Sequence, residues 1–161
     1  MAELPSPPRR AGSARRWRLI AVVAATTALL AATATASAAF QWRRVSIARA
    51  VRCLPVAFSV ADQERGLQGV KRVARPMVFV FSPPVTVWFW MENTPVPLTG
   101  VWIGASHRVA GYWHGRPNST QLHRSPVPVT AVIEYAAGAR VPRVASRFSV
   151  GSGCRVQPGG L

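Results

Sequence analysis

Short apolar blocks recur through most of the chain, and turn-forming residues separate them. Some blocks alternate with small or polar residues, as at Val56, Phe58 and Val60, which is typical of a half-buried strand. Others are uninterrupted, as at residues 77–81, which is typical of a more deeply buried strand. The blocks predict strands at residues 56–60, 77–81, 85–91, 101–103, 108–113 and 129–135.

Proline, glycine and polar residues interrupt the chain before a long helix can form. Residues 82–84 (Ser-Pro-Pro) predict a turn between two adjacent strands, residues 104–107 the turn of a hairpin, and residues 115–128 a loop. Asp62 predicts the cap of a short helix that continues to about Val70. The expected class is therefore mainly β (β-rich α+β), a compact antiparallel barrel or sandwich with one or two short helices.

The amino-terminal 40 residues follow another pattern. Residues 1–18 carry five arginines and one glutamate, and residues 19–40 are uncharged and largely apolar. This order predicts a basic cytoplasmic leader followed by a signal peptide or a transmembrane helix. Small residues near the end of the segment favour cleavage, whereas Trp, Arg and Arg at 42–44 are typical of an uncleaved anchor that attaches the chain to the membrane. In both cases we expect the following domain outside the cytoplasm, secreted or anchored.

Beyond this segment, residues 41–52 are expected to form a linker, residues 53–157 one β-rich domain and residues 158–161 a tail. The formal net charge is +15, and the 122 residues from Phe40 onward keep +11. Their arginines are scattered singly, without a basic helix or a nucleic-acid motif, so no specific nucleic-acid partner is predicted. The arginine excess is typical of a GC-rich genome, with weak attraction to anionic envelope polymers or lipids as the functional alternative.

Cys53 and Cys154 lie 101 positions apart, one near each end of the predicted domain. Outside the cytoplasm two thiols usually form one disulfide, and the predicted export and the pairing support each other. The alternative is two unpaired, buried cysteines that act as small hydrophobic residues.

Four segments resemble the domain of unknown function 192 family, and together they span roughly residues 56–156. They are Arg65-Gly66-Leu67, Met77 to Phe81, Phe89 to Leu98 (Phe-Trp-Met-Glu-Asn-Thr-Pro-Val-Pro-Leu) and Val132 to Gly138 (Val-Ile-Glu-Tyr-Ala-Ala-Gly). The resemblance implies a small, predominantly β domain that is often exported or membrane attached, and it implies no assigned reaction.

Several positions depart from the family pattern. Gln68, Gly69 and Val70 stand where the family continues with methionine and then arginine, and Thr99 and Ser152 stand where aspartates are usual. If those carboxylates serve the family's unknown activity, this chain has lost or altered it.

The candidate ligand-binding residues are Trp90, Asn93, Thr94 and Glu134. Asn93 and Thr94 follow an aromatic run, so their polar groups would lie beside rings as in a small-molecule pocket, or would bond the local backbone in a turn before Pro95. Glu134 lies in an apolar strand, where it either points to solvent or is a buried functional carboxylate. A paired acid/base site would need Glu134 together with Glu92, Glu64 or Asp62, and no spacing brings them together.

No cofactor or metal site is predicted. His107, His114 and His123 lack the spacing of a zinc protease and are expected at the surface, and no serine lies in a nucleophile-elbow motif. Three functions stay open: a binding module for a small molecule or an envelope component, an envelope enzyme with Glu134 as general acid or base, and a purely structural interaction domain.

Overall fold

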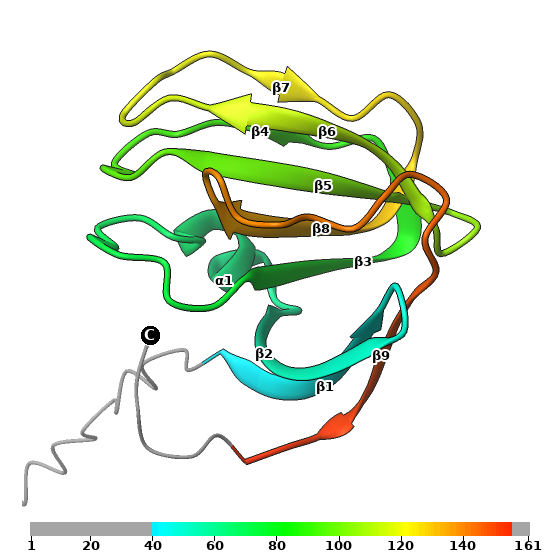
Figure 1. Ribbon diagram of the computed structural model, residues 1–161. Coiled ribbons are helices and arrows are strands. Elements are labelled where there is room, and N and C mark those ends of the chain that lie inside the picture. The colour runs from blue at the N-terminus through cyan, green and yellow to red at the C-terminus, as the bar shows by residue number, and fades with distance from the viewer. Residues whose placement is uncertain (1–39, 156–161) are drawn as a thin grey trace, which may run out of the picture. The chain divides into compact units, whose positions relative to one another are not determined.

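The computed structural model describes residues 40–155, so the predictions for residues 1–39 and for the tail at 158–161 lie outside the described residues. Nine strands and one helix are present there, and the mainly β class is confirmed (Figure 1). The strands are β1 (Gln41–Ile47), β2 (Ala50–Ala57), β3 (Met77–Val85), β4 (Trp88–Phe89), β5 (Leu98–Gly104), β6 (Val109–Gly115), β7 (His123–Arg124), β8 (Val129–Ala136) and β9 (Phe148–Gly153), and the helix is α1 (Val60–Arg65).

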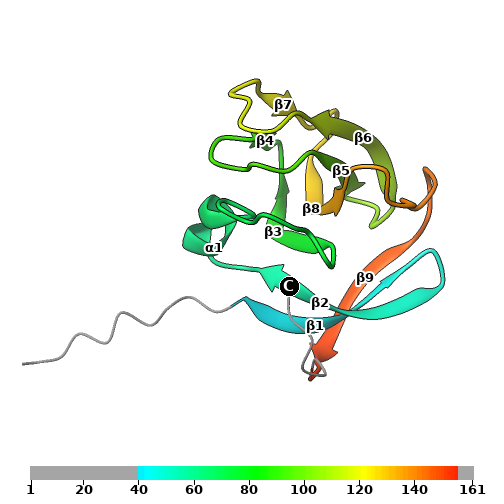
Figure 2. The ribbon, with the colours of Figure 1, turned by 60° about the vertical axis from the view of Figure 1, so that its left-hand side comes forward.

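Seven strands form one open sheet in the order β6-β5-β8-β3-β2-β1-β9, and β4 pairs with β7 in a second, two-stranded sheet. Only β2 and β3 pair in parallel, because α1 carries the chain from the end of one to the start of the other. The segment before β9 also contacts the start of β6. Val109 N donates to Ser146 O at 3.0 Å, and Arg108 and Arg147 form an isolated antiparallel β-bridge. Figure 2 shows β9 crossing from this region to lie along β1. The main sheet is therefore open, whereas a compact antiparallel barrel or sandwich was expected.

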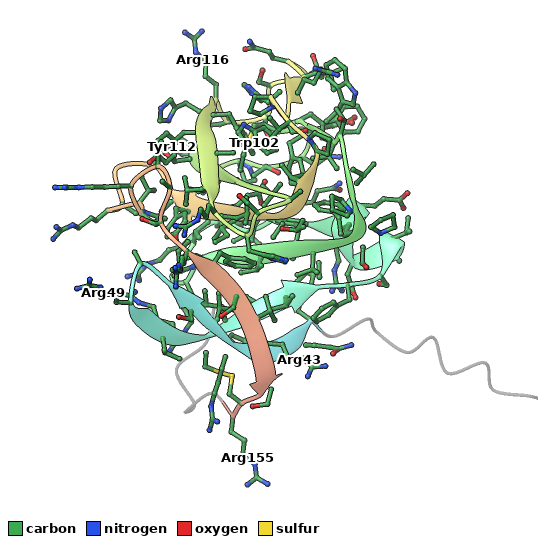
Figure 3. All side chains as sticks on the ribbon, turned by 90° about the vertical axis from the view of Figure 1, so that its right-hand side faces the viewer. Arg43, Arg49, Trp102, Tyr112, Arg116 and Arg155 are labelled. Carbon is green, nitrogen blue, oxygen red and sulfur yellow. A yellow bond between two sulfur atoms is a disulfide. The ribbon has the colours of Figure 1, made fainter. Side chains whose placement is uncertain are left out.

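Residues 41–52 form β1 and the first part of β2, and the expected linker is wrong at this point. Val45 and Ile47 are buried on either side of Ser46, so the segment has the two-residue period of a half-buried strand despite its arginines. A disulfide joins Cys53 of β2 to Cys154, just after β9, with β1 lying between these two strands. Figure 3 shows this bond beside Arg155, whose side chain, like those of Arg49 and Arg116, points away from the sheet.

Two other boundaries differ from the expected ones. The helix begins after Ser59, which caps it through a 3.1 Å bond from Asp62 N to its hydroxyl, and it ends at Arg65 because Gly66 adopts a positive φ. β3 continues through the expected turn at residues 82–84, and the strand expected at 85–91 is reduced to the two residues of β4. The predicted hairpin corresponds to β5 and β6, and the last apolar block to β8.

The sheet has two different apolar faces. The first packs an aliphatic core that includes Val56, Val101 and Ile133. The second packs an aromatic-rich core that includes Phe79, Trp102 and Trp113. Because side chains alternate along a strand, β8 supplies Ile133 and Tyr135 to the aliphatic core and Val132 to the aromatic-rich core. Within residues 40–155, no helix has the length and apolar character required to cross a membrane.

Candidate functional site

A pocket of about 420 Å³ opens beside α1, and we call it the Glu134 pocket. One wall is α1 with the residues that follow it, the opposite wall is the segment 86–94 that contains β4, and β3 and β8 lie between them. Its lining residues are Val60, Gln63, Glu64, Arg65, Gly66, Leu67, Gln68, Phe79, Phe81, Thr86, Val87, Trp88, Phe89, Trp90, Glu92, Thr94 and Glu134. Most of this wall is apolar or aromatic, which is usual for a small-molecule site.

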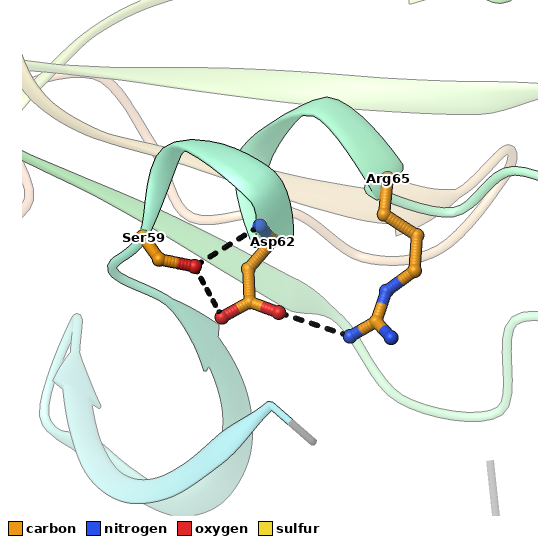
Figure 4. Close-up of polar contacts among 3 residues, drawn as sticks. All are labelled: Ser59, Asp62 and Arg65. Carbon is orange, nitrogen blue, oxygen red and sulfur yellow. Dashed lines mark hydrogen bonds and ion pairs between the residues drawn. The ribbon is translucent and has the colours of Figure 1, made fainter. Parts of the chain in front are cut away.

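Side-chain hydrogen bonds fix the helical wall. The Ser59 hydroxyl donates to Asp62 Oδ2 at 2.7 Å, and Arg65 donates to Asp62 Oδ1 at 3.0 Å (Figure 4). Arg65 also lies over the ring of Phe40, 4.1 Å from its centroid. Gln63 donates to the carbonyl of Val80 at 2.8 Å and so ties α1 to β3. The helix of six residues therefore has a defined position despite its length.

The opposite wall is attached to the loop that follows β6. Met91 N donates to Ser119 O at 2.9 Å, and Asn118 N donates to Thr94 O at 2.9 Å. Val87 N donates to the hydroxyl of the buried Ser125 at 3.1 Å. The segment 86–94 thus acquires its shape from long-range contacts and contains only two residues of regular strand.

Aromatic side chains form both the back and the mouth of the pocket. Phe89 contacts Phe79, Trp102 and Trp113 at centroid separations of 5.1, 5.8 and 5.9 Å, so packed rings support the pocket from behind. Trp88 and Trp90 line the pocket although 57% and 49% of their surfaces are exposed. Exposed tryptophans beside a cavity are the residue type expected at a recognition surface.

Glu134 of β8 contributes a buried carboxyl to the pocket. The residue is only 4% exposed, and its carboxyl makes no side-chain hydrogen bond or ion pair with the described residues. Its oxygens are not among the fully buried atoms without a partner, so they keep some contact with the open pocket. Burial raises the pKa of Glu134 from 4.5 to about 8, since the charged form loses its hydration. A buried carboxyl is uncommon without a partner, and here its environment is a pocket wall.

The same face of the sheet carries an unpartnered donor close to Glu134 in the strand register. Gly100 of β5 pairs with Glu134 on one side and with Trp113 of β6 on the other. A Cβ atom at Gly100 would overlap the indole nitrogen of Trp113, so the indole lies across Gly100 and the absence of a side chain there is required. Within residues 40–155, the buried Trp113 Nε1 has no hydrogen-bond partner.

The structure brings together three of the four residues proposed for ligand binding. Trp90, Thr94 and Glu134 line the pocket, whereas Asn93 does not. Asn93 is exposed with φ +55°, a conformation that asparagine tolerates, and its carbonyl accepts from Gly69 N at 2.8 Å. The hydroxyl of Thr94 donates to Glu92 O at 3.3 Å. Asn93 therefore shapes the turn, and Thr94 contributes both to that turn and to the pocket wall.

Sequence reasoning missed much of the site. Glu64 and Glu92 line the pocket with Glu134, and the chain spacing gave no indication of this. Asp62 instead pairs with Arg65. Trp88 was also missed, although its position two residues before Trp90 predicts the same side in an extended segment.

The histidines do not form a metal site with other residues. His107 and His114 are exposed, and His123 is half-buried and stacks on Trp113 at 4.7 Å between ring centroids. Burial, and secondly His114, lower the pKa of His123. Residues 40–155 contain no group of three histidine, cysteine, aspartate or glutamate side chains placed to hold a metal ion.

Comparison with known families gives the class of the domain. The model of the DUF192 family, described as "Uncharacterized ACR", matches residues 44–157, which is most of the chain. The chain therefore belongs to the domain of unknown function 192 family, as its motifs implied. Among curated proteins, none matches the chain.

Two solved structures share the fold. A protein of unknown function from Novosphingobium aromaticivorans DSM 12444 is 23% identical with a TM-score of 0.58, covering 66% of this chain and 83% of that one. A protein from Sinorhizobium meliloti 1021, described as a candidate transcription regulator, is 24% identical with a TM-score of 0.61, covering 70% of this chain and 95% of that one. At these identities the likeness concerns the fold alone.

Proposed function

We propose that this domain binds a small molecule in the Glu134 pocket. The observation that carries the proposal is the buried carboxyl of Glu134, which lines the pocket and has no partner among the described residues. Burial removes most of the hydration of this carboxyl, and a ligand that pairs with it recovers part of that cost on binding.

The family motifs support the same location. All four segments that resemble the family contribute to the pocket. The lining residues are Arg65, Gly66 and Leu67 from the first, Phe79 and Phe81 from the second, Phe89, Trp90, Glu92 and Thr94 from the third, and Glu134 from the fourth. A purely structural role for these motifs would call for a filled interior with satisfied polar groups. The 420 Å³ pocket and the unpartnered Glu134 favour binding over that alternative.

We further propose that the domain works outside the cytoplasm, in the envelope or after secretion. The disulfide between Cys53 and Cys154 supports this location, because such bonds persist mainly in oxidising compartments. The test is the intact mass of the native protein from the soluble and membrane fractions, with and without reductant. Cysteines that alkylate without reductant would contradict the proposal.

The binding proposal is tested with benzyl alcohol, which has one ring and one polar group and is small enough for the pocket. Titration of the full chain, followed by NMR, should perturb indole signals of Trp88 and Trp90. Trp90→Ala should weaken the affinity several-fold, whereas Tyr112→Ala, an exposed aromatic outside the pocket lining, should not. No perturbation at either tryptophan, or equal effects of the two variants, would overturn the proposal.

A second candidate is an envelope enzyme that uses Glu134 as general acid or base. The specific observation in its favour is the pKa of about 8, which lies near the operating pH of most general acids and bases. Glu64 and Glu92 line the same pocket and are the available second groups. Binding is favoured because no titratable group of the described residues lies within hydrogen-bond distance of the Glu134 carboxyl.

A further inference from the structure

The acidic residues of this strongly basic chain are concentrated at one place. Residues 40–155 contain fifteen basic and four acidic side chains. Three of those four acids, Glu64, Glu92 and Glu134, line the Glu134 pocket. Arg65 is the single basic residue in the described lining, and its charge is matched by Asp62. The pocket is therefore a local site of negative charge on a positive protein.

The exposed rings at the pocket suit a cation as well. The face of a tryptophan ring attracts a positive charge within about 6 Å of its centroid. The ring of Trp88 already contacts a cation within the protein, since the guanidinium of Arg124 lies 5.7 Å from its centroid. Trp90 lines the same pocket and is half exposed.

Glu134 supplies the position for the charge. A cation beside this buried carboxyl would replace the water that the carboxylate loses on burial, whereas an anion there would be repelled. A metal ion is disfavoured because the described residues hold no group of three suitable ligands, and because much of the lining is hydrocarbon.

We infer that the ligand of the Glu134 pocket is a small organic cation, an ammonium group attached to an apolar or aromatic body. The ammonium group lies against Glu134, with Glu64 and Glu92 adding to the negative field, and the apolar body packs on Trp88, Trp90 and Phe89. The inference rests on the proposed function, because it specifies the ligand class of the same pocket.

Binding of a cation should be coupled to ionisation of Glu134. Burial holds the pKa of free Glu134 at about 8, so a bound positive charge favours proton release. Affinity for a permanently charged ammonium should therefore rise between pH 6 and about 8 and then level off. Glu64 and the ion pair of Arg65 with Asp62 face this pocket from α1, and Glu92 faces it from the opposite wall. On the side of β6 and β7 the titratable or charged groups are His123, which stacks on Trp113, His114 beside it, and Arg124, which lies against Trp88.

The experiment compares three matched probes on the full chain: benzylammonium, benzyl alcohol and benzoate, each titrated by calorimetry or NMR at pH 8 and low salt. We expect benzylammonium to bind at least about tenfold more tightly than benzyl alcohol, and benzoate to bind most weakly. Glu134→Gln should remove most of the advantage of benzylammonium over benzyl alcohol. Benzyltrimethylammonium, which keeps its charge at every pH, provides the pH profile, and that profile should be flat in Glu134→Gln.

The outcomes separate the two proposals. If all three probes bind equally, or benzoate binds most tightly, the cation inference is wrong and the pocket remains a binding site. If none perturbs Trp88 or Trp90, both proposals fail. Glu92→Gln is a second test that stays informative if Glu134→Gln fails to fold, because Glu92 is exposed at the pocket wall. It should lower benzylammonium affinity by about twofold or more without changing thermal stability. Unchanged affinity in both variants would also overturn the inference.

Discussion

The two faces of the seven-stranded sheet are built from the same strands but differ in composition and in packing. On one face, Val56, Val101 and Ile133 are fully buried members of a mainly aliphatic core. On the other, Phe89 and Trp113 pack beside a pocket, and Glu134 is buried without a partner among the described residues. Ile133 and Glu134 are adjacent residues of β8, and their side chains lie on opposite faces of the sheet.

This contrast separates stability from function within one strand. A filled apolar core stabilises the fold in proportion to the surface removed from water. A buried carboxyl and an open pocket contribute no such gain, and buried groups of this kind are concentrated at functional sites. We therefore expect substitutions on the aliphatic face to change stability and substitutions on the pocket face to change binding.

The largest effect is expected where the aliphatic half of the sheet is cross-linked. The double substitution Cys53→Ser with Cys154→Ser removes a cross-link between positions 101 residues apart, so the unfolded chain gains conformational entropy. On the chain-entropy model this lowers the free energy of unfolding by about 4 to 5 kcal/mol. Urea unfolding with and without reductant measures it, and the reduced wild type should match the double variant. A loss below about 1 kcal/mol would show that the disulfide contributes little to this half.

A buried residue of the aliphatic core should give the next largest effect. Ile133 is fully buried between β3 and β5, so Ile133→Ala should lower the free energy of unfolding by about 2 to 5 kcal/mol. Ile133→Val is the graded control, with an expected loss of about 0.5 to 1.5 kcal/mol. Benzylammonium affinity should change by less than twofold in both variants at temperatures where they stay folded. A stability loss that is equal for the two variants would contradict close packing at this position.

The sequence predicted the aliphatic half of this contrast better than the pocket. The apolar block around Ile133 predicts a strand from its local pattern of β-branched and aromatic residues, and nearly all of β8 is buried. The block at 85–91 has an equally strong apolar signal, yet beyond the end of β3 at Val85 only Trp88 and Phe89 form a strand. Hydrogen bonds with Ser119 and Ser125 determine the path of this segment. The strand β1 was missed because its arginines suggested a linker, although it pairs with the adjacent β2 and with the distant β9.

The pocket could be predicted only in part for a related reason. Glu134 and Trp90 were found because a carboxylate in an apolar strand and a polar turn after aromatic residues are local signals. Glu64 and Glu92 were not, because they reach the pocket from α1 and from the segment after β4, and no sequence spacing records that proximity. Asn93 was assigned to the ligand on a signal that also describes a turn residue with positive φ.

A smaller effect is expected at Gly100, which separates Glu134 from Trp113 in the sheet register. Gly100→Ala would drive a methyl group into the indole of Trp113, so we expect a loss of about 1 to 3 kcal/mol in the free energy of unfolding. Gly111→Ala is the control, because its Cβ would lie 3.7 Å from Trp102, an ordinary contact. Near-ultraviolet circular dichroism should change in Gly100→Ala only. Equal stabilities of the two variants would show that the indole moves without cost.

The last prediction concerns the pH dependence of stability, and Glu134 is its source. Burial raises the pKa of this carboxyl to about 8, whereas in the unfolded chain the pKa is close to 4.5. Between these values the folded protein holds one more proton than the unfolded chain, so raising the pH favours unfolding. The stabilising contribution is fully present below about pH 4.5 and is lost as the pH approaches 8. The slope should approach about 1.4 kcal/mol per pH unit in this window.

Comparison of the wild type with Glu134→Gln separates the contribution of Glu134 to this slope from that of every other titrating group. The amide has nearly the same shape and no charge, so the wild type minus variant difference in the free energy of unfolding should fall steadily from pH 5 to about 8 and then level off. Chemical unfolding at pH 5, 6, 7, 8 and 9 measures that difference. A difference independent of pH would mean that Glu134 is solvated and ionised in the folded protein. The pocket face would then lack the buried carboxyl that distinguishes it from the aliphatic face, and benzylammonium would have no partner there to favour it over benzyl alcohol.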